Sequence, residues 1–131
     1  MLFQDLDVYK LSVAQAIDVH KLTLAFPKSE GYALADQMRR AAYSIPSNIA
    51  EGALRNASRE YAHFLGIARG SCAELRTLFT IGHGLGYLGS LQDLESRTEQ
   101  ISKLLTGLHR SVQNKVRDGS TAKVKSRTAD P

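Results

Sequence analysis

The chain has 131 residues, of which 43% are hydrophobic and 23% charged, the composition of an ordinary globular protein. No apolar run is long enough to cross a membrane, and the first residues are acidic rather than basic, which argues against a signal peptide. Cys72 is the single cysteine, which excludes an intramolecular disulfide and fits a reducing compartment. We therefore expect one cytoplasmic domain.

The net charge of +4 is concentrated at the C-terminal end. Residues 1–108 contain 11 Lys and Arg against 11 Asp and Glu, whereas residues 109–131 contain 6 against 2. A neutral body with a short basic end is weak evidence for a nucleic-acid partner, because such ends often serve only solubility.

Apolar residues recur at helical spacing along nearly the whole chain, and no segment alternates as a strand does. The first predicted helix covers about residues 6–26, and Pro27 is expected to end it. It carries two apolar stripes, more than one neighbouring helix covers. One stripe is Leu6, Tyr9, Val13, Ile17, His20 and Leu24; the other is Val8, Leu11, Val19, Leu22 and Phe26. On such a stripe His20 is expected to be buried.

Three further helices follow. The second covers about residues 32–54, with Ala35, Met38, Ala42, Ile45 and Ile49 facing inward. The third starts at an N-cap, Ser58, and ends in the glycine-rich segment "GHGLGYLG". The fourth follows a capping pair, Ser90 and Asp93, and fades near Arg117.

Four amphipathic helices with short connections predict an all-α fold, an antiparallel up-and-down four-helix bundle over residues 1–117. Residues 118–131 are polar and aperiodic, which predicts a basic, mobile C-terminal tail.

The segment "RRAAYSIPSNIAEG", residues 39–52, places Pro46 inside the second helix, where it is expected to cause a kink that the nearby small polar residues accommodate. A polar line runs along this helix at intervals of three and four residues: Gln37, Arg40, Ser44, Asn48, Glu51 and Arg55. The line is either a solvated face or a polar network. We expect partial burial and pairing, within the bundle or across a subunit boundary, for Arg40, Asn48, Glu51 and Arg69.

Two glycines, Gly66 and Gly70, lie in the interior of the third helix, where each costs about 1 kcal/mol relative to alanine. They indicate that another backbone approaches closely, either in the bundle, which we favour over a ligand contact, or from a second subunit. Arg69 and Glu74 flank this patch and are expected to pair with the polar line.

No enzyme motif has the context it needs. "GLGYLG" matches a dinucleotide-binding fingerprint, but a helix rather than a strand precedes it. The four histidines share no metal-ligand spacing with one another or with Cys72, which lies on a core stripe. We expect no enzymatic activity, no cofactor and no metal.

Two long segments, "FPKSEGYALADQMRRAAYSIPSNIAEG" and "REYAHFLGIARGSCAELRTLFTIGHGLGYL", resemble the bacterial four-helix bundle family of 23S rRNA-intervening sequence proteins. The resemblance covers about residues 3–110. That family is similar to the accessory variability determinant proteins of diversity-generating retroelements, which form pentameric barrels and bind RNA and reverse transcriptase. The resemblance implies a homopentamer without catalytic residues. The retroelement proteins are strongly basic, whereas this body is neutral.

Two functional hypotheses follow. The first is a non-enzymatic homo-oligomeric adaptor with weak RNA or DNA binding, and its candidate phosphate contacts are Arg39, Arg40, Arg55, Lys115, Arg117, Lys123, Lys125 and Arg127. The alternative is a protein-only scaffold that binds a partner chain. Its interface or network candidates are Gln37, Arg40, Ser44, Asn48, Glu51, Arg69 and Glu74.

Overall fold

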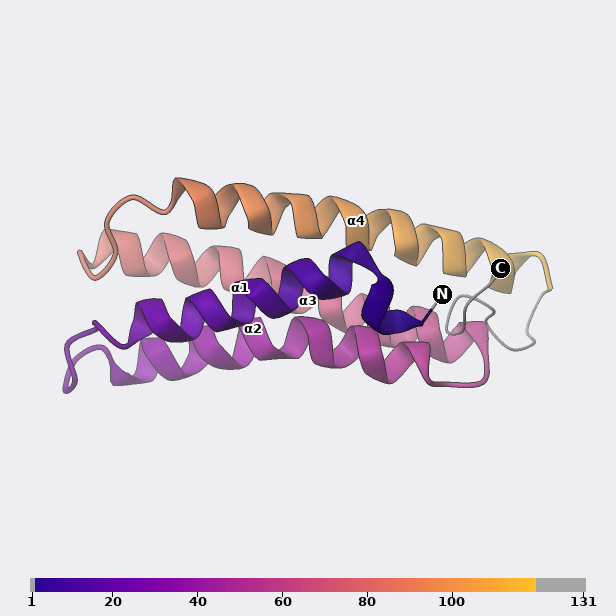
Figure 1. Ribbon diagram of the computed structural model, residues 1–131, viewed down its shortest axis with the longest axis horizontal. Helices are drawn as coiled ribbons and strands as arrows, with labels where there is room; N and C mark the ends of the chain where they lie inside the picture. Colours follow the sequence, from indigo (N-terminus) through magenta and orange to yellow (C-terminus); the bar gives the residue numbers. More distant parts are fainter. Residues whose placement is uncertain (1, 120–131) are drawn as a thin grey trace.

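The computed structural model describes residues 2–119, and every regular element among them is helical. The elements are the 3₁₀ helix η1 (Phe3–Asp5) and the α-helices α1 (Asp7–Thr23), α2 (Tyr32–Ala53), α3 (Ser58–Gly84) and α4 (Gln92–Arg117). The α-helices lie side by side and consecutive ones run in opposite directions (Figure 1). The predicted antiparallel four-helix bundle is confirmed. The predicted tail lies, from residue 120 on, outside the described residues.

The core is built from one stripe of each helix. The predicted inward residues of α2 are all buried, from Ala35 to Ile49. They pack with the buried residues of α3 and α4, the largest of which are Tyr61, Phe79, Leu65, Leu75, Ile101 and Leu105.

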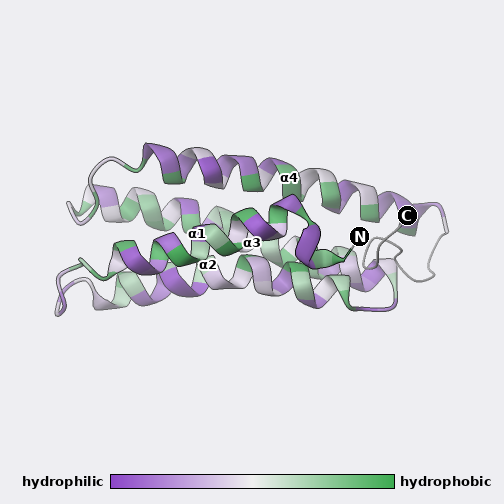
Figure 2. Cartoon of the chain, viewed as in Figure 1, coloured by the Kyte–Doolittle hydropathy of each residue, from purple (hydrophilic) through white to green (hydrophobic). Residues whose placement is uncertain are grey.

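Of the two predicted stripes of α1, the second supplies the fully buried residues, while the first reaches the core only at Leu6 and Tyr9. Val8 and Val19 are buried, whereas Ile17 is 50% and Leu24 65% exposed. Figure 2 shows hydrophobic and hydrophilic residues alternating along this helix. His20 is exposed, so its predicted burial is wrong: it belongs to the stripe that faces away from the core.

The end of α1 comes three residues earlier than predicted. The hydroxyl of Thr23 donates to the carbonyls of Val19 and His20, 3.0 and 2.9 Å away, and accepts a hydrogen bond from Arg39 Nε at 2.7 Å. The next three amides bond to carbonyls only three residues back, a tighter turn than the α-helix. The regular α-helix therefore ends at Thr23 in a tighter turn that leads to Pro27.

Neither predicted capping side chain caps its helix. Ala57 is the N-cap of α3 and Leu91 that of α4, and neither helix start has a side-chain cap bond. Ser58 is instead the first helical residue and is 1% exposed. Close packing holds the connection between α2 and α3 instead. A Cβ at Gly52, near the end of α2, would lie only 2.9 Å from the Cβ of Phe64 on α3.

Pro46 lies inside α2, which continues from Tyr32 to Ala53 as one helix, as predicted. Proline has no amide hydrogen for the carbonyl of Ala42. Two carbonyls of the same turn receive side-chain donors: Ser47 Oγ donates to Tyr43 O and Asn48 Nδ2 to Ser44 O, both at 2.8 Å. The small polar residues beside Pro46 thus support the backbone of this turn.

A buried polar network, which sequence reasoning did not single out, joins α1 to α4. Gln15 and Thr98 are 0% exposed, and the Gln15 amide donates to the Thr98 hydroxyl. Arg97 Nε donates to Gln15 Oε1 at 2.9 Å, and its Nη2 lies 2.5 Å from the carboxylate of Asp18. Since buried polar groups are costly without partners, the network fixes how α1 sits against α4.

We predict that Thr98→Val lowers the free energy of unfolding by about 1–3 kcal/mol, because it removes the hydroxyl partner of the buried Gln15 amide and leaves only the longer, 3.4 Å contact with the Leu94 carbonyl. The matched control is Thr80→Val, since Thr80 is exposed and makes the same hydroxyl bond to a carbonyl four residues back. It should change stability by less than about 0.5 kcal/mol. Urea unfolding at one fixed protein concentration measures both, and equal effects would contradict the role given to Gln15.

Candidate functional site

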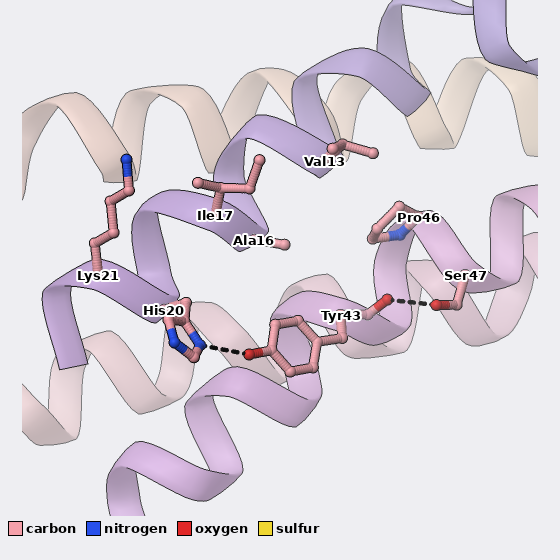
Figure 3. A pocket seen from close by; sticks show the side chains of 8 residues that line it. All are labelled: Val13, Ala16, Ile17, His20, Lys21, Tyr43, Pro46 and Ser47. Carbon is pink, nitrogen blue, oxygen red and sulfur yellow. Dashed lines mark hydrogen bonds between the residues drawn. The ribbon is translucent and has the colours of Figure 1, made fainter. Parts of the chain in front are cut away.

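The candidate site is an open, largely apolar groove between α1 and α2, which we call the Pro46 groove. Its volume is about 450 Å³. Figure 3 shows the eight side chains that line it: Val13, Ala16, Ile17, His20 and Lys21 from α1, and Tyr43, Pro46 and Ser47 from α2.

The groove has a closed floor and exposed walls. Ala16 is 8% exposed and Pro46 is buried, so these two form the floor. Ile17 and Tyr43 form the walls, with 50% and 43% of their surface exposed. His20 Nδ1 lies 2.7 Å from Tyr43 Oη, and this hydrogen bond crosses the groove from α1 to α2. Such a surface is suited to bind apolar side chains rather than to perform chemistry.

The predicted polar line runs along α2 on the side that meets α3. Ser44 Oγ lies 2.7 Å from Ser71 Oγ on α3, and the half-buried Asn48 also bonds to Ser44 Oγ at 2.9 Å. These contacts form the small network expected for Asn48.

Two charged members of the line, Arg40 and Glu51, are more exposed than predicted, and the uncharged Gln37 is exposed as well. The Arg40 side chain is 77% exposed and pairs with Asp36 at 3.0 Å. Glu51 pairs with Arg55 at 2.6 Å and is also exposed. Partial burial of Arg40 and Glu51 is therefore wrong for a single chain, because both pairs form along one helix face instead of across helices.

Each candidate arginine of the body already has an intrachain partner. Arg39 bonds to Thr23, Arg40 to Asp36, and Arg55 bonds to Glu51 while its guanidinium lies 4.9 Å from the ring centre of Phe64. The remaining candidates are Lys115 and Arg117 in the last turn of α4, together with Lys123, Lys125 and Arg127, which lie outside the described residues. Among residues 2–119, Arg39 and Arg40 lie within α2, Arg55 follows its end, and Lys115 and Arg117 lie in the last turn of α4.

Arg69 does not pair with the polar line. It is exposed, and its Nη1 lies 3.0 Å from His109 Nδ1 on α4, so both its predicted burial and its predicted partner are wrong for a single chain. Glu74 is exposed and makes no salt bridge with another residue in the range 2–119.

The glycines next to Arg69 are not explained by packing inside the bundle. A Cβ at Gly66 would meet only His109 Nε2, at 3.8 Å, and a Cβ at Gly70 would have no atom within 4 Å. Of the two predicted sources of close approach, packing inside the bundle therefore does not account for these glycines, and a second subunit stays a prediction.

Features associated with catalysis have structural explanations. Cys72 is 1% exposed, and burial raises the pKa of its thiol, which keeps the sulfur protonated and unreactive. "GLGYLG" forms the turn after α3, where Gly86 has a φ of +79°. Within residues 2–119, no three His, Cys, Asp or Glu side chains are placed to hold a metal ion. None of the helices described is long and apolar enough to span a membrane.

The family model of the 23S rRNA-intervening sequence proteins matches residues 4–107. The chain belongs to this family. In this 23S rRNA-intervening sequence protein, the match covers every residue of the Pro46 groove and of the polar line. It ends before the basic residues Lys115 and Arg117. No curated protein matches the chain.

We predict that Arg69→Ala raises the pKa of His109. Burial and then the positive charge of Arg69 hold this pKa below its ordinary value, and the substitution removes the second cause. NMR titration of the imidazole measures the shift, and Arg76→Ala, an exposed arginine two turns further along α3, is the control.

The lowered pKa of His109 also determines in which direction the stability of the fold changes with pH. As the pH falls below about 6.5, the unfolded chain takes up the proton first, so the stability that neutral His109 contributes is present above that pH and lost below it. An unchanged titration in Arg69→Ala would contradict the contact.

Proposed function

We propose that this protein is a non-enzymatic, homo-oligomeric adaptor whose Pro46 groove is covered by another copy of the chain. The observation that carries the proposal is the outward apolar stripe of α1. Ile17 is half exposed and lies beside the rings of Tyr43 and Pro46. No part of residues 2–119 fills the groove that these side chains line.

Burial of this surface supplies a driving force for association. Removing apolar surface from water contributes about 25 cal/mol per Å², and contiguous exposed apolar surface marks interaction sites. Lys21 at the rim and the His20–Tyr43 hydrogen bond add polar groups around an apolar centre. That arrangement is typical of protein interfaces.

The proposed assembly has five copies. This number comes from the resemblance to the pentameric retroelement proteins. The single buried cysteine also supports our proposal of a reducing compartment such as the cytoplasm.

We predict that light scattering gives five times the 14.4 kDa of one chain for the unaltered protein. Ile17→Asp should produce a monomer, because it places a charge on the apolar wall of the groove. Leu85→Asp is the matched control, since Leu85 is 57% exposed on the turn after α3, outside the groove. A monomeric unaltered protein, or equal masses for the two variants, would contradict self-association through this groove.

Weak RNA or DNA binding is the second candidate, and the basic end of the chain favours it. Arg110 and Arg117 are exposed on α4, and Lys123, Lys125 and Arg127 follow in the sequence. The candidate arginines of the body, Arg39, Arg40 and Arg55, are engaged within the chain, so we expect the basic end to contribute most of any attraction for phosphates. The intrachain pairing also supports the alternative, a protein-only scaffold.

We predict that deletion of residues 118–131 flattens the dependence of log affinity on log salt for single-stranded RNA. Each lost phosphate contact reduces the slope by about 0.7, so the loss of three cations reduces it by roughly two units. An unchanged slope would move the contacts to the body, with Arg40→Ala as the next variant. Absence of binding at low salt would leave the protein-only scaffold as the function.

A further inference from the structure

We propose that the Pro46 groove of one copy receives an exposed ridge on α3 of the next copy. The ridge consists of Glu60, Ile67, Gly70 and Glu74, which are all exposed. This inference rests on the self-association proposed above and adds the surface that fills the groove.

The ridge and the groove have matching charge patterns. On α3, two glutamates flank Ile67 at a spacing of seven residues on each side, which places all three on one helix face. On α1, Lys10 lies seven residues before Ile17 and Lys21 four residues after it, and all three are on one helix face. Acidic residues on both sides of Ile67 thus correspond to basic residues on both sides of Ile17, of which Lys21 lines the groove.

The charged groups of both surfaces are available for contacts with another chain. Lys10, Lys21, Glu60 and Glu74 are exposed and make no salt bridge within residues 2–119. By contrast, other charged residues of α1 and α2, such as Asp18 and Arg40, have partners in the same chain.

The lengths of the two patterns agree as well. At a rise of 1.5 Å per residue, the glutamates are about 21 Å apart and the lysines about 16 Å. The flexible four-carbon lysine side chains are long enough to span the remaining few ångströms. A partner helix seated with Ile67 against Ile17 therefore brings both ends of opposite charge together.

Gly70 gives an independent reason to place a second copy on this face. A glycine inside a helix costs about 1 kcal/mol relative to alanine, and no atom of this chain lies within 4 Å of the position that its Cβ would take. Next to Ile67 on the ridge, it leaves the α3 backbone open to a bulky side chain. Tyr43 on the wall of the groove is such a side chain.

The position of the two surfaces makes the contact head-to-tail. α1 packs on α2 and α4, and α3 also packs on α2 and α4, so α1 and α3 lie diagonally across the bundle. Groove and ridge are different surfaces of each copy. Contacts of this kind form closed rings when the rotation between copies is suitable.

The test is a disulfide cross-link between copies. The variant with both Ile17→Cys and Ile67→Cys should form covalent ladders under mild oxidation, because the two positions face each other across the interface and a disulfide requires Cα atoms within about 7 Å. Either substitution alone should leave single chains on a non-reducing gel. Cys72 is buried and serves as a constant background.

A charge exchange tests the same contact without disulfides. With the ridge parallel to α1 and Ile67 against Ile17, Glu74 lies opposite Lys21. Lys21→Glu and Glu74→Lys should therefore each raise the dissociation constant of the assembly at least about tenfold, and the double variant should restore it. Circular dichroism confirms that these exposed substitutions leave the helices intact.

The outcomes separate this inference from the proposed function. An oligomer by light scattering without ladders in the double cysteine variant would overturn the ridge and retain self-association. Cross-linking by Ile17→Cys alone would also overturn the ridge, because the groove would then face its own copy. A monomer by light scattering would overturn both proposals.

Discussion

The hydrogen bond between Gln15 and Thr98 determines how α1 is turned on the bundle, and the character of the outer surface depends on that rotation. Gln15 is fully buried, and Arg97 and Asp18 extend the contact toward the surface. Successive helix residues are rotated by about 100°, so Ile17, two positions later, points roughly 200° away from Gln15. A buried amide on one side of α1 thus requires an exposed isoleucine on the other.

Pro46 completes the surface from the side of α2. Its ring is apolar, it lacks an amide hydrogen, and it lies buried at the floor of the groove below Ile17 and Tyr43. The backbone of this turn is supported by Ser47 and Asn48, which bond to the carbonyls of Tyr43 and Ser44. The polar residues gathered around the proline therefore stabilise the fold first, and the proline itself shapes the candidate assembly surface.

Periodicity predicted the bundle because burial repeats with the helix. The predicted inward residues of α2 are all buried, and so is Cys72, which the sequence places on a core stripe of α3. The two stripes of α1 were also visible in the sequence, but periodicity does not tell which stripe faces the core. His20 shows the difference: it lies on an apolar stripe, yet it bonds to Tyr43 on the surface.

Contacts between distant residues were beyond reach of the sequence. Gln15 and Thr98 are 83 positions apart, and each alone is an ordinary polar residue in a helix. Arg69 was expected to reach the polar line of α2, but the side of α3 that carries it faces His109 of α4. The sequence did indicate a special role for Gly66 and Gly70, because glycine inside a helix lowers its stability relative to alanine. It does not say which neighbour approaches them.

Hydroxyl-radical footprinting of the assembled protein tests most directly whether the Pro46 groove is covered. Tyr43 and Tyr32 lie on the same helix and are both exposed in the single chain, by 43% and 70%. If another copy fills the groove, Tyr43 becomes protected from oxidation while Tyr32 stays reactive, and the protection disappears in Ile17→Asp. Oxidation of Tyr43 at the same rate in the unaltered protein and in that variant would contradict the covered groove.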